Sequence, residues 1–142
     1  GWFAMGWLDH VRYHSRRGSL EGSSLWSAYA HHSTVTGVIT VAGLTETEAH
    51  DGVVIVHGTD RLTITGDLLH SLKHTLTVPI ILTGAMRPYI MRNTDALQSL
   101  TESLIAVQVM PPGVYCVIHN QVLPFPGVYK DRDQSTFAHN DD

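Results

Sequence analysis

The feature that most constrains the fold of this chain is a set of short, uninterrupted apolar runs. The first is the β-branched run Val53–Val56, which stops at the turn sequence His57-Gly-Thr-Asp60. Such a run is typical of a strand buried on both faces, the environment found in a parallel sheet. Similar runs follow at Pro79–Thr83 and Val114–Ile118. The sequence therefore predicts a sheet that is covered on both sides.

Helical patterns separate these runs. Apolar residues recur at helical spacing after the first run (Leu62, Ile64, Leu68, Leu69 and Leu72) and after the second (Leu97, Leu100, Leu104, Ile105 and Val107). Weaker signals predict a short strand at 38–41, a capped helical turn at 45–48 and a return strand or hairpin arm at 120–124. The alternation of strand and helix predicts a single α/β domain. Its open, mostly parallel sheet would be flanked by helices in a Rossmann-like or flavodoxin-like three-layer arrangement.

The first 37 residues differ from the rest of the chain. They contain three tryptophans and a Ser/Gly-rich stretch at 18–24, with no sustained periodicity of either kind. We interpret residues 1–37 as a divergent N-terminal segment of uncertain structure and residues 38–142 as the α/β domain. A tryptophan-rich start could also dock a partner protein, because this residue type is common at interfaces.

Length and charge exclude several classes of protein. A chain of 142 residues suits one domain, and 9 Lys+Arg against 13 Asp+Glu give a net charge of −4. Only Arg12, Arg16 and Arg17 form a basic cluster, so a nucleic-acid partner is disfavoured. No stretch reaches the roughly 18 apolar residues of a membrane span, and the opening residues are too short for a signal peptide. We expect a cytoplasmic protein without a membrane partner.

The metal-ligating residue types give no complete site. The single cysteine, Cys116, lies within the third apolar run and is predicted to be a buried thiol. His10 and His14 are spaced i, i+4, and His31 and His32 are adjacent, so a zinc site is conceivable. Because no HExxH or paired CxxC motif accompanies them, we favour surface and loop histidines and expect neither a metal nor a cofactor.

Candidate functional residues follow the first two apolar runs. In an open parallel sheet, ligands bind beyond the carboxyl ends of the strands. Residues 57–60 and 84–86 occupy these positions, and each stretch contains a glycine that lets the backbone approach a ligand. Thr59 and Asp60 could be a catalytic pair, or either could simply cap the following helix. Spacing alone leaves both interpretations open.

Several ordered motifs resemble those of the bacterial-type L-asparaginases. They are Asp51-Gly-Val-Val-Ile-Val-His-Gly-Thr-Asp60, Ile81-Leu-Thr-Gly-Ala-Met-Arg-Pro88, Arg92-Asn-Thr-Asp-Ala96, Pro111-Pro-Gly-Val-Tyr115 and Val128-Tyr-Lys-Asp-Arg132. The last two are similar to the closing segment of the short, single-domain members. Their order and spacing make the resemblance fairly specific.

The resemblance implies hydrolysis of the L-asparagine side-chain amide by a threonine nucleophile. By position, Thr59 supplies the hydroxyl of a Thr-Lys-Asp group, Lys130 is its base and Asp60 its carboxylate, which would also bind the substrate α-amino group. A threonine hydroxyl needs such a base, and a lysine serves only when its pKa is lowered toward neutrality. Gly58, with the backbone of Ala85 and Met86, would hold the substrate carboxylate and amide.

The N-terminal part departs from the family pattern. Members begin with a strand and a Thr-Gly-Gly-Thr loop whose threonine accepts the acyl group, and residues 1–50 contain no such loop. Thr34 and Thr36 are weak candidates for that threonine. The stretch 40–43 lacks the expected substrate-binding serine, and Arg61 replaces a small polar residue. The segment could be divergent, the chain could be a degenerate or truncated copy, or Thr59 could be the only nucleophile.

Two functions of different classes remain in competition. One is an amidohydrolase acting on L-asparagine or a related small amide. The other is a catalytically inactive module that binds a small amino acid in the same pocket. A homo-oligomer is expected in either case, partly because sites in the family are usually completed at subunit contacts. Asparagine and glutamine differ by one methylene, which pocket shape discriminates only modestly.

Overall fold

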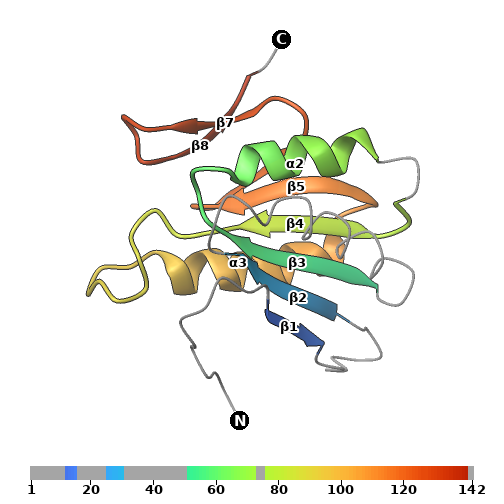
Figure 1. The fold of residues 1–142 in the computed structure, drawn as a ribbon, viewed down its shortest axis with the longest axis horizontal. Coiled ribbons are helices and arrows are strands. Elements are labelled where there is room, and N and C mark those ends of the chain that lie inside the picture. Colours follow the sequence, from blue (N-terminus) through green and yellow to red (C-terminus); the bar gives the residue numbers. More distant parts are fainter. Residues whose placement is uncertain (1–11, 16–24, 31–50, 73–75, 141–142) are drawn as a thin grey trace.

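The computed structural model describes residues 12–15, 25–30, 51–72 and 76–140 (Figure 1). The described strands of the main sheet are β1 (Arg12–Ser15), β2 (Leu25–Ala30), β3 (Gly52–His57), β4 (Pro79–Thr83), β5 (Gly113–Ile118) and β6 (Gln121–Pro124). The described helices are α2 (Leu62–Ser71) and α3 (Ala96–Val109). A separate hairpin follows, made of β7 (Val128–Asp131) and β8 (Thr136–His139).

The main sheet is mostly parallel, as predicted. Its six described strands lie in the order β1-β2-β3-β4-β5-β6. The four central strands run parallel to one another, whereas β1 and β6 pair antiparallel at the two edges. All residues of β4 are buried, and β3 is buried at every position but one. Both faces of the centre of the sheet are therefore covered, as the β-branched runs required.

The two helices lie on opposite faces of this sheet (Figure 1). Alternate residues of β3 point to opposite sides, so Val53 and Ile55 pack with α2 and Val54 packs with α3. On the α2 side, the buried Leu62 and Leu69 form a core with β3, β4, β5 and the hairpin. On the α3 side, the core is smaller and includes Ala106 and Val107. The result is the expected three-layer α/β domain.

The chain connections contain an uncommon feature. Strands β3, β4 and β5 are adjacent and parallel, and each connection steps across the sheet in the same direction. The first passes through α2 on one face and the second through α3 on the other, so the two crossovers have opposite hands. About 98% of such crossovers are right-handed. One of these two is therefore of the rare left-handed kind.

This topology creates a place for a site. The loops that follow β3 and β4 leave neighbouring strand ends toward opposite faces of the sheet. Such a divergence leaves the carboxyl ends of the two strands accessible, and open α/β sheets bind ligands beyond the carboxyl ends of their strands. The predicted functional residues 57–60 and 84–86 lie on these two loops.

The described elements extend beyond the predicted ones at both ends of the chain. Strands β1 and β2 come from the first 37 residues, for which the sequence predicted no structure, and β2 pairs in parallel with the whole of β3. The boundary proposed at residue 38 stays a prediction. The strand expected at 38–41, the turn expected at 45–48, and His10, His31 and His32 lie outside the described residues.

The C-terminal hairpin is anchored by apolar contacts. Val128 and Phe137 are buried in the α2-side core, and Phe137 is completely inaccessible. Cys116 is also inaccessible, as predicted, and burial raises the pKa of its thiol to about 12. Among the described residues, no helix is long and apolar enough to cross a membrane.

Candidate active site

The loops after β3 and β4 touch at a glycine. A Cβ atom on Gly84 would lie 2.5 Å from the His57 carbonyl oxygen and 3.2 Å from the Thr59 methyl group. Any side chain here would push the two loops apart, because a contact of 2.5 Å to backbone cannot be accommodated without movement. Gly84 therefore sets the close approach of the two predicted functional stretches.

Lys130 is brought to the same point by the C-terminal hairpin. Its Nζ lies 2.8 Å from Thr59 Oγ1 and 2.8 Å from Asp60 Oδ1, although Lys130 is 71 and 70 residues away in the chain. The Lys130 side chain is 20% exposed, whereas that of Asp60 is 75% exposed. A hydroxyl, an amine and a carboxylate thus form one hydrogen-bonded group at the carboxyl edge of the sheet.

Asp60 is held as a carboxylate by its neighbours. The hydrogen bond from Lys130 and the charge of that residue lower the pKa of the Asp60 carboxyl, and Arg132 contributes further. The Arg132 guanidinium lies 3.4 Å from the same oxygen, Oδ1. Because this carboxylate is largely solvent-exposed, it can accept a further donor from a bound molecule.

The helix-capping interpretation of Thr59 and Asp60 does not describe this geometry. Helix α2 begins at Leu62 with Arg61 as its N-cap residue, and no side chain caps it there. The side chains of Thr59 and Asp60 instead contact Lys130. Their side chains are therefore available for chemistry.

A buried histidine supports the turn that carries Thr59. The His57 Nδ1 lies 2.8 Å from the Gly58 carbonyl oxygen, and Nε2 lies 2.9 Å from Thr65 Oγ1. Because a carbonyl oxygen only accepts, Nδ1 carries the proton and Nε2 accepts from the Thr65 hydroxyl. Burial lowers the pKa of His57, with a smaller lowering from the charge of Arg61, although the bond to Gly58 opposes both. The ring is therefore uncharged near neutral pH.

The loop after β4 is held by a second carboxylate. Asp95 accepts hydrogen bonds from the backbone N–H groups of Met86, at 3.0 Å, and Arg87, at 2.9 Å. The Met86 N–H is thus already engaged with Asp95. Asp95 lies in the motif 92–96, but no pattern in the sequence assigned it this role.

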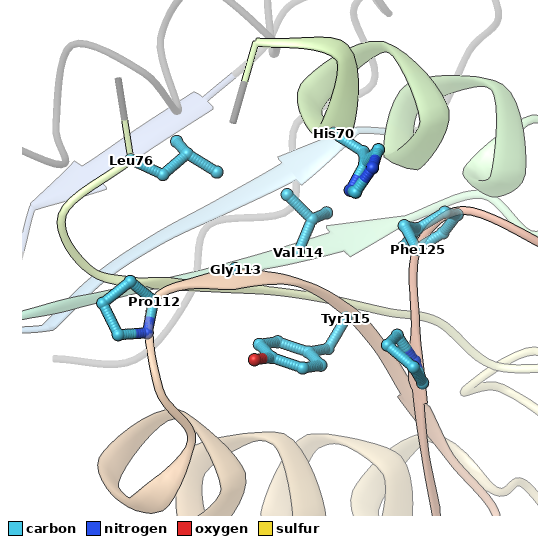
Figure 2. Close-up of a pocket in the computed structure, with 8 residues that line it drawn as sticks. His70, Leu76, Pro112, Gly113, Val114, Tyr115 and Phe125 are labelled. Carbon is cyan, nitrogen blue, oxygen red and sulfur yellow. The ribbon is translucent and has the colours of Figure 1, made fainter. Parts of the chain in front are cut away.

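A separate concavity of about 240 Å³ lies near the opposite end of the strands (Figure 2). It is lined by His70, Leu76, Pro112, Gly113, Val114, Tyr115, Pro124 and Phe125. Gly113 begins β5, so this concavity lies at the amino end of the strands, away from Lys130. Its lining is mainly apolar and contains none of the predicted site residues.

This α/β domain brings a threonine hydroxyl, a lysine amine and a carboxylate together beyond the carboxyl ends of its strands, and such groups can activate a hydroxyl. The sequence profile of the family described as "Asparaginase, N-terminal" matches residues 24–139. The match includes β2 and the two loops that carry the candidate site. The chain belongs to this family.

Individual relatives agree with this assignment. An L-asparaginase of Thermococcus kodakarensis is 33% identical over 76 residues, which are 54% of this chain and 23% of that protein. A glutamyl-tRNA(Gln) amidotransferase component of Aeropyrum pernix is 32% identical over 111 residues, 75% of this chain and 26% of that protein. The solved thermostable L-asparaginase from T. kodakarensis superposes with a TM-score of 0.67 at 27% identity, covering 75% of this chain and 33% of that one.

The chain spans about a quarter to a third of the length of these relatives. The relatives include proteins with two different names, an asparaginase and part of an amidotransferase. The chain is therefore similar to parts of proteins with both names.

Proposed function

We propose that this protein hydrolyses the side-chain amide of L-asparagine to aspartate and ammonia. In this proposal Thr59 is the nucleophile, Lys130 is its base and Asp60 is the carboxylate that orients Lys130. The observation that carries the proposal is the placement of Lys130 Nζ at 2.8 Å from both Thr59 Oγ1 and Asp60 Oδ1. Family membership supports the same reaction class.

The proposed reaction begins with a proton transfer. The step requires Lys130 in its amine form, which accepts the proton of the Thr59 hydroxyl while the threonine oxygen attacks the amide carbon. The C–N bond then breaks, and the leaving nitrogen takes a proton from the Lys130 ammonium to depart as ammonia. Water hydrolyses the resulting ester, which releases aspartate and restores the hydroxyl.

The remaining groups would bind the substrate. Asp60 keeps Lys130 oriented, and its exposed carboxylate is suited to the α-ammonium group of an amino acid. Gly58 and Ala85 lie on the two loops that Gly84 brings together, and Met86 follows Ala85 in the second loop. Their backbone is suited to holding the carboxylate and amide of the substrate. Thr34 and Thr36, the weaker nucleophile candidates, lie outside the described residues.

Assembly into a homo-oligomer is part of the proposal. Helix α3 exposes apolar side chains on its outer face, including Leu97 at 61%, Ile105 at 59% and Val109 at 73%. Burying such residues between copies is favourable, because apolar area removed from water contributes about 25 cal/mol per Å². A cytoplasmic location stays a prediction.

The proposal is tested by ammonia release from L-asparagine and, in parallel, from L-glutamine. Replacing Thr59 by Val removes the hydroxyl at nearly constant volume, so we expect the rate to fall by about 10²- to 10⁴-fold, the usual contribution of a positioned proton transfer. Thr59→Ser keeps a hydroxyl and is the matched control, which should retain most of the activity.

Equal ammonia release by the wild-type protein and Thr59→Val would remove Thr59 from the reaction. The competing function, an inactive amino-acid-binding module, gives a different result. It requires an increase in unfolding temperature with aspartate or asparagine and no ammonia even at high protein concentration.

A further inference from the structure

The Asp95 carboxylate that holds the loop after β4 is itself held by a histidine. Asp95 is buried, and its Oδ2 lies 2.6 Å from Nε2 of His119. Burial opposes ionisation of Asp95, but the N–H groups of Arg87 and Met86 and the His119 ring together lower the pKa of its carboxyl. The Asp95 carboxylate thus accepts a hydrogen bond from each of these three groups. In the bond with His119, Nε2 carries the proton and donates it to Asp95.

The other nitrogen of the same ring reaches the C-terminal hairpin. His119 Nδ1 lies 2.8 Å from Thr136 Oγ1, and a hydroxyl can either donate to this nitrogen or accept from it. His119 occupies the turn between β5 and β6 with a positive φ of 49°, a conformation that non-glycine residues adopt only rarely. The turn therefore holds the ring between two elements that are distant in the sequence.

Thr136 lies close to Lys130 in the hairpin register. It pairs with Asp131, and the next pair along the hairpin is Lys130 with Phe137. One chain of hydrogen bonds therefore runs from the Met86 and Arg87 amides through Asp95 and His119 to Thr136, on the hairpin that carries Lys130. It joins the loop proposed to bind substrate to the hairpin proposed to supply the base.

The bond to Thr136 adds a directional contact to the hairpin, besides those that Lys130 and Arg132 make with the loop after β3. Strands β7 and β8 form their own two-stranded sheet and do not join the hydrogen-bond ladder of the main sheet. Val128 and Phe137 fix the hairpin to the core through apolar packing, which is not directional. The bond between His119 and Thr136 restricts how the hairpin is placed relative to Asp95 and the loop.

We propose that His119 is a positioning residue that, with Asp95 and Thr136, sets the placement of Lys130 relative to the loop 84–87. This inference rests on the proposed amidohydrolase function. His119 acts through other residues and does not itself touch the reacting atoms.

The test uses substitutions that change one bond at a time. Thr136→Val removes the hydroxyl at constant shape, and Thr136→Ser restores it. His119→Asn tolerates the positive φ but is too short to reach Asp95. We expect Thr136→Val and His119→Asn each to lower kcat/KM for asparagine by about 10- to 100-fold, mostly through kcat, because a displacement of about 1 Å can cost 100-fold. Thr136→Ser should recover most of this loss.

A second readout does not depend on activity. Hydrogen exchange of the Met86 and Arg87 amides, followed by NMR, should become faster in His119→Asn, because Asp95 loses the partner that holds it. Unchanged exchange in this variant would overturn the proposal, as would a Thr136→Ser variant as impaired as Thr136→Val. If the wild-type protein releases no ammonia, the proposed function fails while the exchange result still decides the positioning role.

Discussion

At the scale of single residues, the turn that carries Thr59 depends on His57, whose ring must stay uncharged. The His57 ring is buried, and it donates to the Gly58 carbonyl while it accepts from Thr65. Protonation would add a hydrogen to Nε2, so Thr65 could no longer donate to it, and would place a positive charge in a desolvated site. The neutral ring is therefore the form that fits the folded protein.

This histidine makes stability depend on pH. The pKa of His57 in the folded protein is lowered below 6.5, the value assigned to an unperturbed ring. Between the two values the unfolded chain binds more protons than the folded one, so stability is full above pH 6.5 and is lost as the pH falls toward the folded pKa. This one group contributes a slope of at most about 1.4 kcal/mol per pH unit.

We expect His57→Asn to reduce the pH dependence of the free energy of unfolding below pH 6.5, measured by urea denaturation. Asn can still donate to the Gly58 carbonyl but does not titrate. His139→Asn is the matched control, because His139 is only partly buried and lies in the hairpin. An unchanged slope in His57→Asn would show that His57 does not resist protonation.

The residues of the site were predictable to very different degrees. Thr59, Asp60 and Lys130 could be placed together only through the family resemblance, since no local pattern links positions 70 residues apart. His57, Asp95 and His119 were not assigned, although the first two lie within the quoted motifs. Their roles depend on hydrogen-bond geometry across loops, which periodicity and spacing do not encode.

At the scale of elements, strand β7 of the hairpin carries Lys130, whereas strand β8 carries Phe137, which anchors the hairpin to the core. Lys130 and Phe137 are register partners, and Phe137 is inaccessible within the α2-side core. The hairpin was not predicted as a pair of strands. Its strands have four residues each, too short to show an apolar alternation that stands out.

Truncating Phe137 tests this anchoring. Phe137→Ala should reduce the free energy of unfolding by about 3–5 kcal/mol, the usual cost of removing a buried phenylalanine ring. Phe137→Leu keeps most of the apolar volume, so its loss should be clearly smaller. Both values come from urea denaturation. A loss below about 1 kcal/mol for Phe137→Ala would mean that the hairpin is not fixed through this side chain.

The longer elements were predicted well. Strands β3, β4 and β5 and both described helices lie where the apolar runs and helical spacing placed them, because burial on both faces leaves a clear signal. Strands β1 and β2 were missed. Strand β2 lacks a continuous β-branched run, and its structure comes from pairing with β3. Tertiary contact overrides weak local preference in such a strand.

At the scale of the whole molecule, the opposite hands of the two crossovers explain where the site lies. The loops after β3 and β4 depart toward opposite faces, and the hairpin after β6 brings Lys130 to Thr59 and Asp60 on the first of these loops. The pattern of strands and helices predicted the class of fold and the location of the site at the carboxyl ends of the strands. It did not predict the hand of the crossovers, because the sequence pattern does not say which face each helix covers.

The central claim is that Thr59 and Lys130 act as one proton-transfer unit. It is tested most directly by a double-mutant cycle on ammonia release from L-asparagine, using Thr59→Val, Lys130→Met and the combined variant. Residues that work as a unit give strongly non-additive losses. We expect each single variant to lose about 10²- to 10⁴-fold in kcat, with no further loss in the double variant. Single losses that multiply in the double variant, or single variants with wild-type rates, would contradict the claim.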